Sequence, residues 1–235
     1  MKTSIADLLA SMENDDPDIR ADAACDIGES GTKDKRAIAA LIRHLKDDNS
    51  QVRAFSARAL GGIGGKAALK PLINSLSEVD SCWNSNAAAN ALGDLGNPAA
   101  VPRLITLLST HPNDDVRRAA TLALAYLKAP RAVRPLTAAL LGDSCADVRF
   151  EAADALGYIA DRRAVPGLIT ALSEAGERDS VYVREHAAMA LAKIGDGRAL
   201  GALRNLLKSD KTSRVREAAR EAIKVIERVT KKQSS

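Results

Sequence analysis

The stretch that organises the chain reads Val148-Arg149-Phe150-Glu151-Ala152-Ala153-Asp154-Ala155-Leu156-Gly157-Tyr158-Ile159. Six further copies of it, some close and some loose, recur along the remaining sequence. The position equivalent to Arg149 falls at residues 20, 53, 85, 117, 149, 184 and 216, so the steps are 33, 32, 32, 32, 35 and 32 residues. A fixed period of this size is the signature of a solenoid, in which each unit stacks on the next.

Each copy carries an apolar stripe with helical spacing. Counted from the arginine as zero, positions −1, +3, +4, +7 and +10 are Val, Ala, Ala, Leu and Ile in most copies, which places them on one side of a helix. Glycines such as Gly96 and Gly195 follow and are expected to end that helix, because glycine readily adopts positive φ. Asn97 and Asp196 then stand where the next helix needs an N-cap.

A second motif follows the cap and reads as another helix, as in Ala100-Val101-Pro102-Arg103-Leu104-Ile105. Its recurrent proline is tolerated near a helix start, where the missing N–H has no partner to lose. Each unit is thus a helical hairpin that cannot bury its faces alone. We predict an all-α fold, an α-solenoid of about seven hairpins, forming a single domain over residues 1–235 with a C-terminal tail at 229–235. The repeated arginines are expected to pair with an Asp or a carbonyl of an adjacent repeat, which is a structural role.

The shared pattern Asp-x-x-Val-Arg-x-x-Ala-Ala-x-Ala-Leu-Gly-x-Ile-Gly-Asp-x-x-Ala-Val-x-x-Leu resembles the HEAT-like repeats of the phycocyanobilin lyase type over about residues 15–228. The resemblance implies a superhelix whose Val-Arg helices line the concave side. Such repeats occur in bilin lyases, phycobilisome-degradation factors, iron–sulfur assembly partners and many binding proteins, so the resemblance implies the fold more strongly than an activity. Deoxyhypusine hydroxylase uses these repeats with paired His-Glu motifs for iron. His44, His111 and His186 are not followed by Glu, which excludes that interpretation and predicts no metal site.

Charge and composition narrow the class of protein. The net charge of +4 on 235 residues is too small to imply nucleic acid or a membrane by itself. The ends differ, since residues 1–31 hold eight acids against two bases and residues 198–235 hold eleven bases against four acids. This asymmetry fits two polar end caps, or head-to-tail self-association. No apolar run is long enough to span a bilayer, and three cysteines without motif spacing predict a reducing, cytoplasmic compartment.

The six aromatic residues of the chain all fall at positions that the repeat leaves free: −2, +1, +2, +5 and +9. Trp and Tyr at solvent-facing positions are typical binding anchors, so we predict an aromatic-lined groove that binds a partner protein. The alternative for Phe55 and Phe150 is that they only fill gaps between helices. The candidate partner-binding residues are Trp83, Asn86, Asn90, Arg118, Leu122, Tyr126, Phe150, Asp154, Tyr158, Tyr182, His186 and Met189.

Three functions fit these residues. A non-catalytic binding scaffold is favoured, because no catalytic motif is present and no cofactor is required. The resemblance supplies an alternative, a bilin lyase-like or chromophore-handling protein of phycobiliprotein assembly or degradation. In it the groove would stack a bilin, Arg118 would pair with its propionates and Asp154 with its pyrrole nitrogens. Nucleic-acid binding is the third interpretation, and Asp115, Asp147 and Asp154 disfavour it because they would repel phosphate on the same face.

Overall fold

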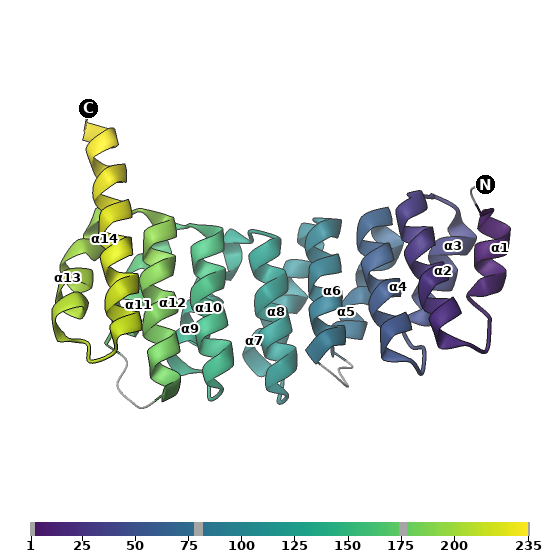
Figure 1. Ribbon diagram of the computed structural model, residues 1–235, viewed down its shortest axis with the longest axis horizontal. Coiled ribbons are helices and arrows are strands. Elements are labelled where there is room, and N and C mark those ends of the chain that lie inside the picture. Colours follow the sequence, from purple (N-terminus) through teal and green to yellow (C-terminus); the bar gives the residue numbers. More distant parts are fainter. Residues whose placement is uncertain (1–2, 78–81, 174–177, 235) are drawn as a thin grey trace.

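The structure is a computed structural model that describes residues 3–77, 82–173 and 178–234, with every side chain in these ranges except those of residues 82, 83, 178, 179, 233 and 234. Over these residues the chain forms fourteen α-helices and four short 3₁₀ helices, and no strand. The helices stand side by side in one elongated row (Figure 1). The predicted all-α solenoid is therefore confirmed.

The row consists of two layers, a front layer of even-numbered helices and a back layer of odd-numbered ones (Figure 1). The front layer contains α2 (Pro17–Ser30), α4 (Ser50–Ile63), α6 (Cys82–Leu95), α8 (Asp114–Tyr126), α10 (Ala146–Ile159), α12 (Arg178–Ile194) and α14 (Ser213–Ser234). The back layer contains α1 (Ile5–Ser11), α3 (Lys35–His44), α5 (Lys66–Ser77), α7 (Val101–Thr110), α9 (Val133–Gly142), α11 (Val165–Ala171) and α13 (Leu200–Ser209). The 3₁₀ turns η1 (Pro98–Ala100), η2 (Pro130–Ala132), η3 (Arg162–Ala164) and η4 (Gly197–Ala199) precede the last four back helices.

The hydrophobic core lies between the two layers. Each front helix packs against the back helix that precedes it and against the next front helix, in order from α2 to α14. The predicted apolar stripe faces this interior, and in α10 its members Val148, Ala152, Ala153 and Leu156 are fully buried. Because alanine and leucine fill the interior, the large aromatic side chains are not needed there.

Glycine at position +8 allows the front helices to approach closely. A Cβ atom added to Gly61 would lie 2.7 Å from the Cα atom of Ala91, and one added to Gly157 would lie 2.9 Å from that of Ala190. Real Cβ atoms do not come this close to backbone atoms, so a larger residue would force the two helices apart. The close approach of α4 to α6 and of α10 to α12 thus depends on a residue with no side chain.

Arginines at position zero join one repeat to the next. Arg117 is largely buried, and its Nε and Nη2 atoms donate to both carboxylate oxygens of Asp143 at 2.8 Å. Its Nη1 atom donates to two carbonyl oxygens of the loop before its own helix, at 2.9 and 3.0 Å. The predicted structural role of these arginines is confirmed. The same fork joins Arg20 to Asp47, and the Nε atom of Arg184 donates to Asp210 at 2.7 Å.

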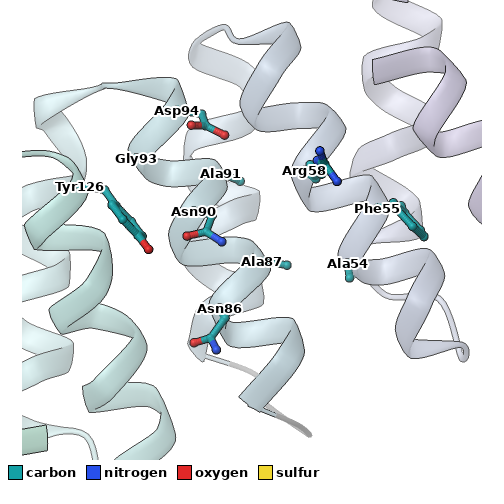
Figure 2. Close-up of a pocket in the computed structure, with 10 residues that line it drawn as sticks. All are labelled: Ala54, Phe55, Arg58, Asn86, Ala87, Asn90, Ala91, Gly93, Asp94 and Tyr126. Atoms are coloured by element: carbon teal, nitrogen blue, oxygen red, sulfur yellow. The ribbon is translucent and has the colours of Figure 1, made fainter. Parts of the chain in front are cut away.

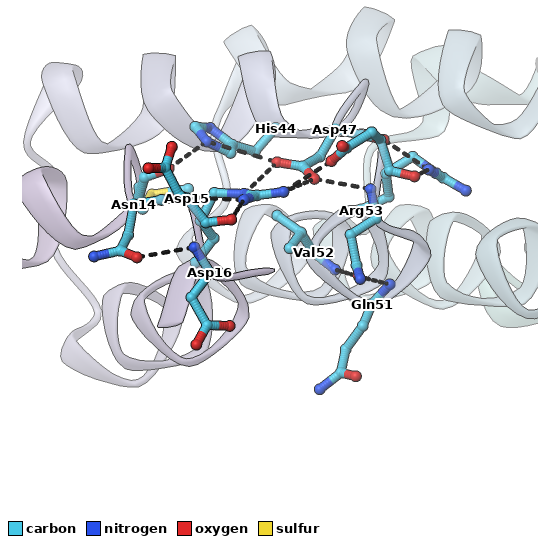
Figure 3. Close-up of polar contacts among 12 residues, drawn as sticks. Asn14, Asp15, Asp16, His44, Asp47, Gln51, Val52 and Arg53 are labelled. Atoms are coloured by element: carbon cyan, nitrogen blue, oxygen red, sulfur yellow. Dashed lines mark hydrogen bonds and ion pairs between the residues drawn. The ribbon is translucent and has the colours of Figure 1, made fainter. Parts of the chain in front are cut away.

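Figure 3 shows the first of these junctions, where Asp47 lies between the first two repeats. Its carboxylate accepts from Arg20 at 2.7 and 2.9 Å, and its carbonyl oxygen accepts from Arg53 of the next front helix at 2.6 Å. His44 is buried beside it, with its Nε2 atom 2.7 Å from the carbonyl oxygen of Met12. This histidine is therefore part of the structural framework.

The helix ends follow the predicted caps. Gly96 and Gly195 have φ values of 61° and 70°, and the side chains of Asn97 and Asp196 accept from the backbone of η1 and η4. One proline departs from the expected position, because Pro71 lies inside α5. There the segment equivalent to the 3₁₀ turns of later repeats is continuous with the α-helix. The segment predicted as a tail, residues 229–235, continues α14 as far as Ser234.

Candidate functional site

Three tyrosines project from successive front helices. Tyr126 of α8 is 47% exposed, Tyr158 of α10 is 55% exposed and Tyr182 of α12 is 37% exposed. Met189 of α12 adds a fourth large apolar side chain, 41% exposed. We call these four residues the tyrosine face. A series of large apolar side chains left in solvent is unusual for a soluble surface unless something binds there.

Other predicted residues are less accessible. Phe55, Leu122 and Phe150 are half-buried and pack against the core, so much of their surface serves to fill the space between helices. Phe150 still reaches the tyrosine face, because its ring centroid lies 6.1 Å from that of Tyr182. Trp83 lies in α6, but its side chain is outside the part of the chain that the structure describes.

The polar residues of α10 and α12 are engaged with each other. The Nδ1 atom of His186 lies 2.7 Å from an Oδ atom of Asp154, and the His186 ring lies 5.0 Å from that of Phe150. The hydrogen bond to Asp154 raises the pKa of His186 above its usual 6.5, and the partial burial of the ring opposes this shift. Burial raises the pKa of the neighbouring Glu151 carboxyl, and nearby Arg118 opposes that shift.

Further charges on this face also have partners. Arg118 pairs with Asp115 within α8 at 3.2 Å. Arg214 of α14 pairs with Glu185 at 2.6 Å and lies over the ring of Tyr182, with its Cζ atom 5.1 Å from the centroid. Lys193 similarly lies over the Tyr158 ring, with Nζ 4.0 Å from its centroid. The polar groups around the tyrosine face therefore largely satisfy one another.

A hollow of about 600 Å³ lies over α6, between α4 and α8 (Figure 2). Residues of α6 line its middle, and Figure 2 shows Phe55 and Arg58 on the α4 side and Tyr126 on the α8 side. A smaller hollow of about 220 Å³ continues from it toward α2 and shares Phe55, Arg58 and Asp94 with it. We call the larger space the α6 hollow. It is lined by Ala54, Phe55, Arg58, Asn86, Ala87, Asn90, Ala91, Gly93, Asp94 and Tyr126.

The predicted residues thus fall into two groups. Asn86, Asn90 and Tyr126 meet at the α6 hollow, whereas the others in described positions gather over α8, α10 and α12. Arg58 and Asp94 were absent from the predicted set, although both occupy positions that the repeat leaves free, +5 and +9. The predicted set already contains the charged residue Asp154 at position +5, so applying the same criterion to positions +5 and +9 of every repeat would have found both.

Two further observations concern metal binding and membrane insertion. Within residues 3–77, 82–173 and 178–234, no three or more His, Cys, Asp or Glu side chains are grouped so that they could hold a metal ion. No helix in the same ranges is both long enough and apolar enough to cross a membrane.

Fold and exposed face together define an α-solenoid repeat protein. The family model for HEAT repeats matches residues 5–81, 70–144 and 133–224. These matches cover nearly the whole chain, and the chain therefore belongs to the HEAT repeat family, as the sequence resemblance predicts. No curated protein matches the sequence at a significant level.

Several solved structures with a similar fold align with nearly the whole of this chain. The complex of CpcE and CpcF of phycocyanin lyase from a Nostoc species is 24% identical, with a TM-score of 0.54 over 97% of this chain and 96% of that one. Human deoxyhypusine hydroxylase is 26% identical, with a TM-score of 0.49 over 95% of this chain and 84% of that one. The karyopherin Kap121p, bound to the extreme C-terminus of the phosphatase Cdc14p, has a TM-score of 0.64 at 15% identity, over 94% of this chain and 29% of that one.

Proposed function

We propose that this chain is a non-catalytic scaffold that binds another protein on the exposed side of its front helices. The observation that carries the proposal is the tyrosine face: three tyrosines and a methionine, each at least one-third exposed, on three successive helices. Tyrosine supplies a large apolar contact area with little loss of side-chain entropy on binding. We place this scaffold in the cytoplasm, in keeping with its unpatterned cysteines.

The related structures support a protein as the ligand. Kap121p is bound to a segment of another protein, and the lyase structure is a complex of two chains. Both use the fold found here. We infer from them only the kind of ligand, a protein. Their sequence identity to this chain is too low to suggest a particular partner.

The two alternative functions find less support in the side chains. In the chromophore hypothesis, Arg118 and Asp154 would hold the propionates and pyrrole nitrogens of a bilin. Both are already paired, Arg118 with Asp115 and Asp154 with His186. In the nucleic-acid hypothesis, phosphates would approach a face that carries Asp115, Asp154 and other carboxylates, which oppose binding.

Affinity purification from a native lysate of the source organism tests the proposal. We expect proteins captured by the wild type to be lost with the double variant Tyr158→Ala/Tyr182→Ala. Leu141→Ala is the matched control, because Leu141 is also largely exposed, at 46%, but belongs to the back layer. Equal recovery with all three proteins would contradict the proposal. An absorbance scan of the eluate checks the chromophore alternative, which predicts a visible band.

A further inference from the structure

The α6 hollow differs from the tyrosine face in the state of its polar groups. The side chains of Arg58, Asn90 and Asp94 line it, and among the described residues none of them forms a hydrogen bond or an ion pair. Asn86 is also at the hollow, and its Oδ1 atom is buried without any hydrogen-bond partner. Buried polar atoms are normally paired, so the Oδ1 atom of Asn86 is an exception. Arg58, Asn90 and Asp94 are exposed to solvent. One buried acceptor and three exposed polar groups around one hollow are thus available to a polar ligand.

The two asparagines indicate the kind of ligand. A side-chain amide carries donors on its nitrogen and an acceptor on its oxygen, which matches the C=O and N–H groups of a peptide unit. Asn86 and Asn90 are one turn apart on α6, a rise of about 6 Å. Alternate residues of an extended chain are about 6.6 Å apart. One extended segment lying along α6 can thus meet both amides with residues two apart.

We propose that the α6 hollow binds an extended segment of the partner protein, lying along α6 and hydrogen-bonded through its main chain to Asn86 and Asn90. This inference rests on the proposed scaffold function and gives it a second contact region. A helical segment would not use these amides, because its own backbone N–H and C=O groups are already paired. An extended segment has them available. Ala87, a small and partly exposed residue of α6, leaves room for its backbone to come close, whereas Ala91 is buried against Gly61 and Gly93 lies against Tyr126.

Unpaired charges set a further requirement on the segment. Arg58 projects from α4 and Asp94 from α6, and both lie toward the same end of the hollow (Figure 2). Successive side chains of an extended chain point to opposite sides. Neighbouring acidic and basic residues in the segment would therefore reach Arg58 and Asp94 respectively. We expect ligands of this hollow to contain such an adjacent pair of opposite charges.

A phage-displayed library of random dodecapeptides, panned against the full-length chain, provides the probe. We expect enriched peptides that contain an adjacent acid–base pair and bind the wild type when synthesised, as measured by fluorescence anisotropy. Asn90→Ala and Arg58→Ala should each weaken binding at least tenfold, whereas Asn205→Ala, an exposed asparagine of the back layer, should leave it unchanged. Methylation of a single backbone nitrogen of the peptide should abolish binding when that nitrogen faces one of the asparagines. Methylation at the other positions should leave binding largely intact.

Three results would overturn the inference: no enrichment, peptides that keep full affinity for Asn90→Ala, or peptides that become helical by circular dichroism when bound. The first two can be separated from a failure of the scaffold function. If the peptides lose affinity for Tyr158→Ala and keep it for Asn90→Ala, the scaffold function is supported and the α6 hollow is not its binding site. Lysate partners that depend on the tyrosines while no peptide enriches would lead to the same conclusion.

Discussion

Arg117 joins two repeats through four hydrogen bonds, two to Asp143 and two to loop carbonyls. The side chains of Arg117 and Asp143 are only 11% and 8% exposed. Removing one partner of a buried ion pair costs about 3–5 kcal/mol, because the other charge stays buried without compensation. We expect Arg117→Ala to lower the free energy of unfolding by about 3 kcal/mol, measured by urea denaturation.

The next residue is the control for this prediction. Arg118 also pairs with an aspartate, but within its own helix, and the carboxylate of that aspartate is 41% exposed. Such pairs contribute about 0.5 kcal/mol or less. Equal losses of stability in Arg117→Ala and Arg118→Ala would contradict the assignment of a structural role to position zero alone.

The pair His186–Asp154 makes a pH-dependent prediction. The hydrogen bond holds the pKa of His186 above its usual 6.5 in the folded state. The stabilisation is therefore fully present below pH 6.5 and is lost as the pH rises through the higher folded pKa. We expect the stability difference between wild type and His186→Gln, at most about 1 kcal/mol for this partly exposed pair, to shrink as the pH rises above 6.5.

Nuclear magnetic resonance titration of the imidazole gives a direct measurement. In Asp154→Asn the main cause of the upward shift is gone, while the partial burial that lowers the pKa remains. The His186 pKa should then fall. An unchanged titration in that variant would show that the ion pair does not form in solution.

At the level of single residues, the sequence was informative where the repeat is regular. The pairing of the position-zero arginines could be predicted, since a charge that recurs every 32 residues in a buried setting needs a regular partner. The pairs Arg118–Asp115 and His186–Asp154 could not, because they depend on which side chains face each other across neighbouring turns and helices. For this reason three residues predicted to bind a ligand, Arg118, Asp154 and His186, have intramolecular partners.

At the level of helices, two adjacent glycines of α4 give opposite predictions. A Cβ added at Gly61 would meet the backbone of Ala91, whereas one added at Gly62 meets nothing within 4 Å. Gly61→Ala should therefore separate α4 from α6 and cost about 1–3 kcal/mol. Gly62→Ala should stabilise the protein by about 0.5–1 kcal/mol, because alanine restricts the unfolded chain and favours the helix. Thermal unfolding of both variants checks the pair.

A similar change in stability in both variants would mean that the close approach at Gly61 is not essential to stacking.

The helix ends show how far the conformation of a residue can be predicted from sequence alone. Gly96 and Gly195 have the positive φ that their position requires, yet Ala160 adopts it too, with φ of 55°. Alanine has no local preference for this conformation, so residue type alone does not predict every helix end.

Considered as a whole, the molecule has its main contacts between helices close together in the chain. Such a fold is readable from sequence, because each repeat needs only its neighbours to be buried. The α6 hollow was not readable in the same way. It forms where the third copy replaces Val-Arg with Asn84-Ser85 and where small residues of α6 lie between larger ones of α4 and α8. Its existence depends on how three repeats are set against each other.

The opposite charges at the two ends of the row lead to a prediction about the whole molecule. The acidic helices α1 and α2 lie at one end and α14 at the other (Figure 1), so the opposite charges cannot neutralise each other within one chain. Several bases of α14 pair locally, such as Arg220 with Glu217 and Lys224 with Glu221. Arg228 and Lys232 are exposed near its end.

We therefore expect head-to-tail association that is weak and sensitive to salt. Sedimentation at about 10 mM ionic strength, where charges act over about 30 Å, should show assemblies that grow with protein concentration. They should disappear near 0.3 M salt. Arg228→Glu/Lys232→Glu should abolish association, whereas Lys66→Glu/Lys70→Glu, which makes the same charge change in the middle of the row at exposed positions of α5, should weaken it far less. Equal effects of the two double variants would assign association to net charge, and a monomer at every salt concentration would make the ends simple polar caps.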